Sequence, residues 1–432
     1  MKIIQLLARI DGSGVTRYII ELNKGLKMLG NEVEIISLNT GFKDADGYSA
    51  ASTQTIEDAK LLDFSDETTN YINQADLVII NAIVDRRATL RNEWIDLVAN
   101  KITTKKVIVV NDHKPAGFRA YYGDLLKNKE FWLSFDKICT FAYDARVYRD
   151  IRKTIGEDEA TKRFMHLQLP YEFDDNVRAN WVPFNDKLRR VTYLGRHAPF
   201  KDNHRLVRGK DPFYAHGYEV EMRGIKATVN VSITPNLKYE FDENGEVVYE
   251  TEGPRKGLRK HSKMCRLITN KWKRENGIAI DDEMVYSPKR DNVIYIFDAY
   301  KRETGLDIVA HSAFGCDFFH LDYDGCYGDD FEYTIFEMAE HGSIPLLDWG
   351  AGNAIHMADE NDVDTGKTAY EMGLGIFVKK DLTNIEEALN QMDELMNDGA
   401  KYDEMRNRIY EAFKANCNTK AIVSKFIENI YK

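Results

Sequence analysis

Two cations follow an apolar run near the middle of the chain, in the segment LGRHAPFKD. They are Arg196 and Lys201, and the run Arg189–Arg196 predicts a strand. A guanidinium pairs with phosphate through two hydrogen bonds and an ammonium acts as a point charge, so together they suit a diphosphate. Basic loop residues are usually only solvated. The carboxyl end of a parallel strand, where α/β proteins bind ligands, favours the phosphate role.

A second segment, EYTIFEMAEHGSIPLL, contains two carboxylates, Glu332 and Glu337. Five residues turn a helix by about 140°, so the two cannot share one helical face. We therefore expect Glu332 ahead of a helix and Glu337 inside it, where a carboxylate can accept two ribose hydroxyls. The first-turn N–H groups would then point at an anion, and they belong to Tyr333, Thr334 and Ile335. The alternative is an ordinary solvated helix with acidic residues near its N-terminus.

A third segment, VIVVNDHKPAGF, places Asp112 and His113 directly after a predicted strand, Lys106–Asn111. An adjacent Asp-His pair at a strand end can orient an acceptor hydroxyl or take its proton. Taken alone, such a pair is more often a satisfied loop pair. Its position at the same sheet edge as the glycine turn below favours the acceptor role.

That glycine turn follows the first predicted strand, Lys2–Ala8, in the phrase RIDGSGVTRYIIEL. Gly12, Ser13 and Gly14 open the backbone between the strand and a predicted helix. Such a turn presents bare N–H groups and a helix N-terminus to a phosphorylated ligand. It is shorter than G-x-G-x-x-G, so a dinucleotide site is not implied, and a tight turn without a ligand is the alternative.

Metal-binding patterns are weak in this sequence. Asp322-Tyr323-Asp324 resembles a DxD cation motif, but it equally suits an acidic strand end. The ten histidines form no HxxxH or HExxH pair. We therefore predict no metal ligands, while leaving a divalent cation possible.

Bulk composition describes a soluble globular protein of two domains. The chain has 432 residues, 43% of them hydrophobic and 30% charged, which fits two cores of about 200 residues each. No apolar run approaches the roughly 20 residues that span a bilayer, so we expect no membrane partner. Five cysteines without CxxC spacing favour free thiols in a reducing cytoplasm. The net charge is −11, yet nine Lys/Arg and no acid lie between Arg255 and Arg274.

Strands and helices alternate, which predicts parallel, doubly wound sheets. The strands expected in the first part are Lys2–Ala8, Val33–Leu38, Leu77–Asn81, Lys106–Asn111 and Lys137–Phe141. Those expected in the second are Arg189–Arg196, Tyr218–Gly224, Val293–Tyr300, Phe318–Tyr323, Ser343–Trp349 and Gly375–Lys380. We divide the chain into domains at 1–180 and 181–415. A hairpin around Asn244-Gly245 and a basic helix form an insertion at 227–290, and a last amphipathic helix, Ala421–Tyr431 within 416–432, returns to brace the first domain.

At these residues the chain resembles a known family. The architecture is similar to the GT-B glycosyltransferases, which have two Rossmann-like domains facing a central cleft that holds a nucleotide-sugar. The phrases resemble the DNA α-glucosyltransferases of T-even bacteriophages, which move glucose from UDP-glucose onto 5-hydroxymethylcytosine in double-stranded DNA with retention. The match is carried, in order, by GSGVTRYIIEL, GNEVEIISL, VIVVNDH, GRHAPFK, EMRGIKA, FDAYKRETGLDIVAHSAFG and EYTIFEMAEHGSIPLL.

The resemblance implies a role for each matching position. Gly12–Gly14 would lie under the donor sugar-phosphate, and Arg196 and Lys201 would hold the diphosphate. Glu332 would contact the transferred sugar and Glu337 the uridine ribose. Asp112 and His113 would lie near the acceptor base. The insertion at 227–290 looks longer than in the family, and the segment expected to hold the uracil, Tyr286–Lys289, matches poorly.

The resemblance also implies the partners. DNA phosphates would meet the following basic residues: Arg86, Arg87, Arg255, Lys256, Arg259, Lys260, Lys263, Lys271, Lys273 and Arg274. The modified cytosine would be flipped out of the duplex to reach the cleft. The protein would be a phage-encoded monomer in the cytoplasm of the infected host. Other readings keep the fold with another donor such as UDP-arabinose, another modified pyrimidine or a polysaccharide acceptor. A DNA-binding protein with a degenerate nucleotide cleft is the non-enzymatic alternative.

Overall fold

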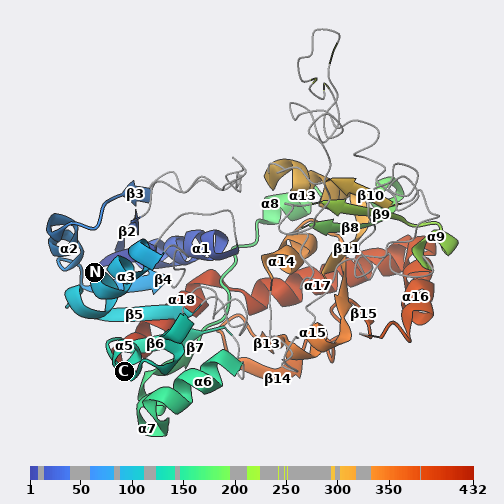
Figure 1. Ribbon diagram of the computed structural model, residues 1–432. Coiled ribbons are helices and arrows are strands. Elements are labelled where there is room, and N and C mark those ends of the chain that lie inside the picture. Colours follow the sequence, from blue (N-terminus) through green and yellow to red (C-terminus); the bar gives the residue numbers. More distant parts are fainter. Residues whose placement is uncertain are drawn as a thin grey trace, which may run out of the picture.

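The computed structural model describes residues 1–7, 14–38, 59–81, 88–110, 123–141, 146–194, 212–223, 242, 248, 251, 293–296, 302–317, 332–379 and 381–432. Two parallel sheets organise these residues, one built from the first part of the chain and one from the second (Figure 1). The insertion expected at 227–290 lies outside them, apart from three isolated positions.

The first sheet has seven strands in the order β3-β2-β1-β4-β5-β6-β7. Its strands are β1 (Lys2–Leu7), β2 (Glu32–Ser37), β3 (Ala59–Leu61), β4 (Leu77–Asn81), β5 (Lys106–Val110), β6 (Lys137–Thr140) and β7 (Phe164–His166). Every neighbouring pair is parallel. The strand order reverses between β1 and β4, and ligands of doubly wound proteins bind beyond the carboxyl ends at such a point.

Helices cover both faces of this sheet. They are α1 (Gly14–Met28), α2 (Asp66–Ile72), α3 (Ala88–Asp96) with its π-helical extension η1 (Leu97–Lys101), η2 (Gly123–Lys127), α5 (Lys129–Leu133), α6 (Arg146–Ile155) and α7 (Glu157–Arg163). One core joins alternate strand residues to α1, and the other joins the opposite residues to Trp94, Trp132 and Tyr148. Strands buried on both faces must be continuously apolar, which explains runs such as LVIIN in β4.

A linker crosses to the second sheet through α8 (Asp175–Ala179) and η3 (Phe184–Asp186). The second sheet has six strands in the order β10-β9-β8-β11-β12-β15, again all parallel. They are β8 (Leu188–Leu194), β9 (Glu219–Arg223), β10 (Val293–Ile296), β11 (Ser312–Asp317), β12 (Ile344–Asp348) and β15 (Ile376–Val378). The strands β13 (His356–Ala358) and β14 (Asp364–Thr368) form a separate antiparallel pair.

The second group of helices packs around this sheet and then returns to the first. They are α9 (Pro212–Ala215), α13 (Arg302–His311), α14 (Tyr333–Glu340), α15 (Trp349–Ala354), α16 (Ile385–Asn397), α17 (Gly399–Asn416) and α18 (Thr419–Tyr431). In Figure 1 the red helix α17 runs below α14 and leads to α18, which lies with the first sheet, where both chain ends are found. Among the described helices, none has the length and apolarity needed to cross a bilayer.

The strand β11 corrects the sequence analysis, which assigned no strand to SAFGCD and placed one at Phe318–Tyr323, outside the described residues. Its small residues are poor strand formers, but β11 is fully buried between β8 and β12, and packing overrides propensity there. A Cβ atom at Gly315 would lie 2.4 Å from Met338 Cγ, so glycine lets α14 approach this strand closely. The short strand β7 and the strand β3 were also not predicted.

The contact between α1 and α18 depends on a glycine. A Cβ atom at Gly25 would lie 2.4 Å from Val423 Cγ2 and 2.9 Å from Thr419 Cγ2. We expect Gly25→Leu to lower the free energy of unfolding by about 3 kcal/mol because the side chain forces the helices apart. Urea unfolding measures this loss, with Lys27→Leu on the exposed face of α1 as the control. Adding Val423→Ala should recover part of the loss, and a fully additive double variant would contradict this packing.

An ionic cluster attaches α16 to the second sheet. His216 Nδ1 lies 2.6 Å from Asp393 Oδ2, and the Tyr218 hydroxyl donates to Asp393 Oδ1 at 3.0 Å. Arg189 pairs with the same carboxylate. The hydrogen bond to Asp393, with that to Glu386, raises the pKa of His216 above its usual value.

The raised pKa of His216 predicts a pH-dependent contribution to stability. A pKa that is higher in the folded than in the unfolded chain stabilises the fold below about pH 6.5, and the contribution disappears as pH rises through the folded value. His216→Gln should therefore lower the urea midpoint more at pH 5.5 than at pH 9. A difference between the two proteins that stays constant from pH 5.5 to 9 would contradict a charged His216.

Candidate functional site

The helix α14 begins directly beside the carboxyl end of β11. Glu332 is its N-cap residue, with extended backbone angles (φ −105°, ψ 141°), and Glu337 lies inside the helix. This confirms the predicted placement of the two carboxylates on either side of the helix start. The Thr334 hydroxyl donates to Asp317 Oδ2 at 2.5 Å, and Asp317 ends β11. This bond fixes the first turn of α14 against the strand end, where the positive end of the helix dipole can attract an anion.

One detail of the predicted anion site is wrong. The N–H of Ile335 donates to the Glu332 carbonyl at 3.1 Å, closing a tight first turn. It is therefore not available to a ligand, in contrast to the expectation for Tyr333, Thr334 and Ile335 together. The two N–H groups that remain for an anion at this helix end belong to Tyr333 and Thr334, since the first N–H groups of a helix have no partner within it.

Glu337 is a buried carboxylate at the junction of the two sheets. Only 9% of its surface is exposed, and the same fraction applies to Arg17 on α1. Burial opposes a charge on Arg17, but Glu21, Tyr171 and Glu337 outweigh it and raise the pKa of the guanidinium. The N-terminal part of α1 and the second turn of α14 therefore interact through opposite charges. Sequence reasoning missed Arg17, whose only signal was a cation three residues after the glycine turn.

Arg17 is anchored on its own helix. Its guanidinium lies 2.8 Å from Glu21 Oε1, and Glu21 is fully buried. Lys24 Nζ approaches the same carboxylate at 3.2 Å, and the Glu172 N–H donates to it at 3.3 Å. One buried carboxylate thus holds two cations and the start of the linker.

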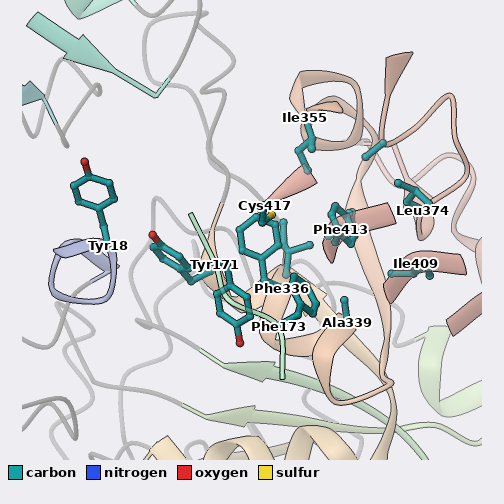
Figure 2. Close-up of a cluster of buried hydrophobic side chains, with 14 of the residues drawn as sticks. Tyr18, Tyr171, Phe173, Phe336, Ala339, Ile355, Leu374, Ile409, Phe413 and Cys417 are labelled. Atoms are coloured by element: carbon teal, nitrogen blue, oxygen red, sulfur yellow. The ribbon is translucent and has the colours of Figure 1, made fainter. Parts of the chain in front are cut away.

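Aromatic rings of the linker fill the space between α1 and α14. The Arg17 guanidinium lies 5.1 Å from the Tyr171 ring centroid, and Tyr171 packs on Phe336 with 5.4 Å between centroids. Figure 2 shows Tyr171 and Phe173 beside Phe336 at this junction, with Tyr18 on α1 nearby. The Tyr333 hydroxyl donates to the Pro170 carbonyl at 3.2 Å. The linker residues Pro170, Tyr171 and Phe173 therefore pack between α1 and α14, next to the candidate site.

Glu340 fixes the linker from the other end of α14. Its carboxylate accepts from the Tyr171 hydroxyl at 2.6 Å and from the Asp174 N–H at 2.8 Å. Its carbonyl accepts from Trp181 Nε1 at 2.6 Å. Burial, with the charge of Glu340, raises the pKa of Tyr171 well above its usual value, so the phenol remains a donor.

The other candidate residues flank the described elements. Gly14 is the first residue of α1, while Gly12 and Ser13 lie outside the described residues. Arg196 and Lys201 follow β8, and Asp112 and His113 follow β5, all outside the described residues. The same holds for the candidate DNA-binding residues Arg86, Arg87, Arg255, Lys256, Arg259, Lys260, Lys263, Lys271, Lys273 and Arg274, and for Asp322–Asp324. Their roles stay predictions.

Among the described residues, neither a metal cluster nor the cavity beside β7 marks the α1–α14 junction. No group of three or more His, Cys, Asp or Glu side chains in the described ranges could hold a metal ion. That cavity, of about 380 Å³, lies between β7, α18 and β14, away from the α1–α14 junction. Two of its lysines are already paired: Lys425 Nζ lies 3.0 Å from Asp362 Oδ2, and Lys137 donates to the Lys162 carbonyl.

The chain is similar in fold to solved glycosyltransferase structures. No family model matches the chain, and no curated protein matches its sequence. Among solved structures, it is similar to an alpha-glucosyltransferase in complex with UDP, with a TM-score of 0.71, 16% identity and full coverage of both chains. It is also similar to an alpha-glucosyltransferase in complex with UDP and a 13-mer DNA containing a HMU base, with a TM-score of 0.71, 19% identity and coverage of 100% of this chain and 99% of that one.

A sugar-transferring enzyme of lower similarity also matches over the full chain. Trehalose-6-phosphate synthase has a TM-score of 0.57 at 11% identity, with coverage of 100% of this chain and 99% of that one. These matches rest on the fold, because the sequence identities are only 11–19%. The chain therefore has the fold of the GT-B glycosyltransferases.

Proposed function

We propose that the protein is a retaining glycosyltransferase that moves a sugar from a UDP-sugar to the hydroxyl of a modified cytosine in double-stranded DNA. We infer glucose as the sugar and 5-hydroxymethylcytosine as the acceptor. The observation that carries the proposal is the start of α14: an N-cap glutamate, two first-turn N–H groups and a buried second glutamate at the junction of the two sheets. The full-length likeness to alpha-glucosyltransferases in complex with UDP supports it.

The donor site follows from the chemistry of these groups. Glu337 accepts two hydrogen bonds from the ribose hydroxyls, as a charged acceptor beside them can. Arg196 and Lys201, which follow β8, neutralise the diphosphate together with the positive end of α14. Glu332, outside the helix, contacts the transferred sugar, and Gly12–Gly14 lies close to the sugar-phosphate.

Retention without a dedicated nucleophile requires substitution on one face of the sugar. The bond from the anomeric carbon to the diphosphate oxygen breaks as the acceptor oxygen bonds to that carbon. The hydroxyl proton passes to the departing diphosphate, so no separate base is needed. The protein contributes positioning and stabilisation of the negative charge that develops on the diphosphate.

The acceptor side belongs to the first sheet in this proposal. Asp112 and His113, which follow β5, orient the acceptor hydroxyl. A base within a duplex cannot reach the junction, so the modified cytosine flips out at a cost of a few kcal/mol. The basic residues between Arg255 and Arg274, with Arg86 and Arg87, hold the phosphates. Reversing these charges should reduce the slope of DNA affinity against salt concentration.

Product mass tests the function directly. The protein is incubated with a panel of UDP-sugars, UDP-glucose and UDP-arabinose among them, and with hydroxymethylated DNA. The DNA is digested and its nucleosides are weighed, with unmodified DNA as the control. A nucleoside heavier by one hexose residue with UDP-glucose supports the proposal. Oligosaccharide acceptors are tested in parallel, and a sugar found only on them would favour a polysaccharide-building enzyme.

A further inference from the structure

We propose that Arg17 is a positioning residue of the donor site, acting through Glu337. Its guanidinium, on helix α1 of the first half, orients the Glu337 carboxylate on helix α14 of the second half, which binds the ribose. The affinity for the nucleotide then depends on contact between the two halves of the molecule. This inference rests on the proposed function, because it assumes that a UDP-sugar binds at Glu337.

The first support is geometric. Arg17 is the fourth residue of α1 and Glu337 the fifth residue of α14, and both are nine-tenths buried. The guanidinium is held on one side by Glu21 at 2.8 Å and on another by the Tyr171 ring at 5.1 Å. These contacts leave Arg17 little rotational freedom, so it presents a fixed charge to α14.

The second support is the hydrogen-bonding state of Arg17. Its Nε atom is buried and has no hydrogen-bond partner among the residues that the structure describes. A buried donor without an acceptor costs free energy of folding. A role of Arg17 in the complete donor site explains why the chain keeps such a group there. A planar guanidinium that already uses one edge on Glu21 can offer its remaining donors to a second carboxylate.

The third support is electrostatic. Glu21 is fully buried, and its single negative charge is shared by Arg17 and Lys24. Glu21 therefore does not neutralise the whole charge of Arg17. The charges of Arg17 and Glu337 attract across the junction. The charge of Glu337, a second buried carboxylate, offsets that remaining charge, whereas Lys24 is more exposed and pairs with Glu21 and Glu172.

A double-mutant cycle on UDP binding tests the inference. The dissociation constant for UDP is measured by calorimetry for the wild type, Arg17→Gln, Glu337→Gln and the double variant. We expect about tenfold weaker binding for Arg17→Gln and about 30-fold for Glu337→Gln. If Arg17 acts through Glu337, the double variant binds within about twofold of Glu337→Gln, because the effects of coupled residues do not add.

Three further readouts separate positioning from structure. Lys24→Gln removes the other cation on Glu21 and should leave UDP affinity within about twofold of wild type. Arg17→Lys keeps the charge and should recover part of the affinity, and it serves as the folded substitute if Arg17→Gln does not fold. In steady-state transfer, Arg17→Gln should raise KM for the donor more than it lowers kcat, since ribose contacts are the same in ground and transition states.

The possible failures are distinguishable. Effects of Arg17→Gln and Glu337→Gln that multiply in the double variant would overturn the inference and leave the proposed function standing. Wild-type UDP affinity in Glu337→Gln would remove Glu337 from the donor site and overturn the inference, whereas a wild-type protein that binds no UDP would overturn the proposed function. A Lys24→Gln variant as weak as Arg17→Gln would reduce Arg17 to a structural partner of Glu21.

Discussion

Exchanging Glu337 for glutamine should weaken UDP binding about 30-fold while the protein keeps its fold. Glutamine preserves the shape of the side chain, but only its amide oxygen can still accept hydrogen bonds. It removes the negative charge, and charge-assisted hydrogen bonds are roughly twice as strong as neutral ones. Two ribose hydroxyls that each lose about 1 kcal/mol account for the expected factor. Isothermal titration with UDP measures the change.

Two controls make the Glu337 result specific. Glu387→Gln removes a carboxylate from the exposed face of α16 and should not change UDP affinity. Binding of free phosphate ions should be nearly unchanged in Glu337→Gln, because the ribose contact is absent. A variant that loses UDP affinity together with its circular dichroism spectrum would report unfolding rather than a lost ribose contact.

Replacing Glu340 with leucine should lower the free energy of unfolding by about 3 kcal/mol. The change removes both carboxylate oxygens that accept from the Tyr171 hydroxyl and the Asp174 N–H. Each buried donor left without an acceptor costs about 1–3 kcal/mol, and the added apolar contact offsets part of this. Urea unfolding followed by tryptophan fluorescence measures the loss. Trp181, which donates to the Glu340 carbonyl, lies at this junction.

A second substitution assigns part of that loss to one hydrogen bond. Tyr171→Phe alone should cost about 1 kcal/mol, because Glu340 keeps the Asp174 N–H. In the Glu340→Leu background the same change should cost almost nothing, since the hydroxyl no longer has its acceptor. Equal costs of Tyr171→Phe in both backgrounds would show that the linker is not held by this bond.

Much of the fold could be predicted because its strands are buried on both faces. Runs such as KVIVV in β5 and LVIIN in β4 are apolar at nearly every position, which is typical of strands buried on both faces. The strand SAFGCD escaped prediction because its packing depends on Met338 of a later helix, which touches Gly315. No local pattern records such a contact.

In the site, too, the features set by neighbouring residues could be predicted, and those set by residues far apart in the chain could not. Helical geometry alone places Glu332 before α14 and Glu337 within it, and the structure confirms that placement. The tight turn that uses the Ile335 N–H depends on the backbone of Glu332, which residue types do not reveal. Arg17 was missed because Glu337, the residue that gives it its role, comes more than 300 residues later in the chain. The donor and DNA-side roles of Arg196, Lys201, Asp112 and His113 stay predictions.

The central claim is that UDP binds at the start of α14, beside the carboxyl end of β11. A crystal structure of the protein grown with UDP tests it most directly. We expect the diphosphate at the first turn of α14, within reach of Arg196 and Lys201, and the ribose hydroxyls on the Glu337 carboxylate. Nucleotide density elsewhere, with Glu337 turned away from it, would contradict the account.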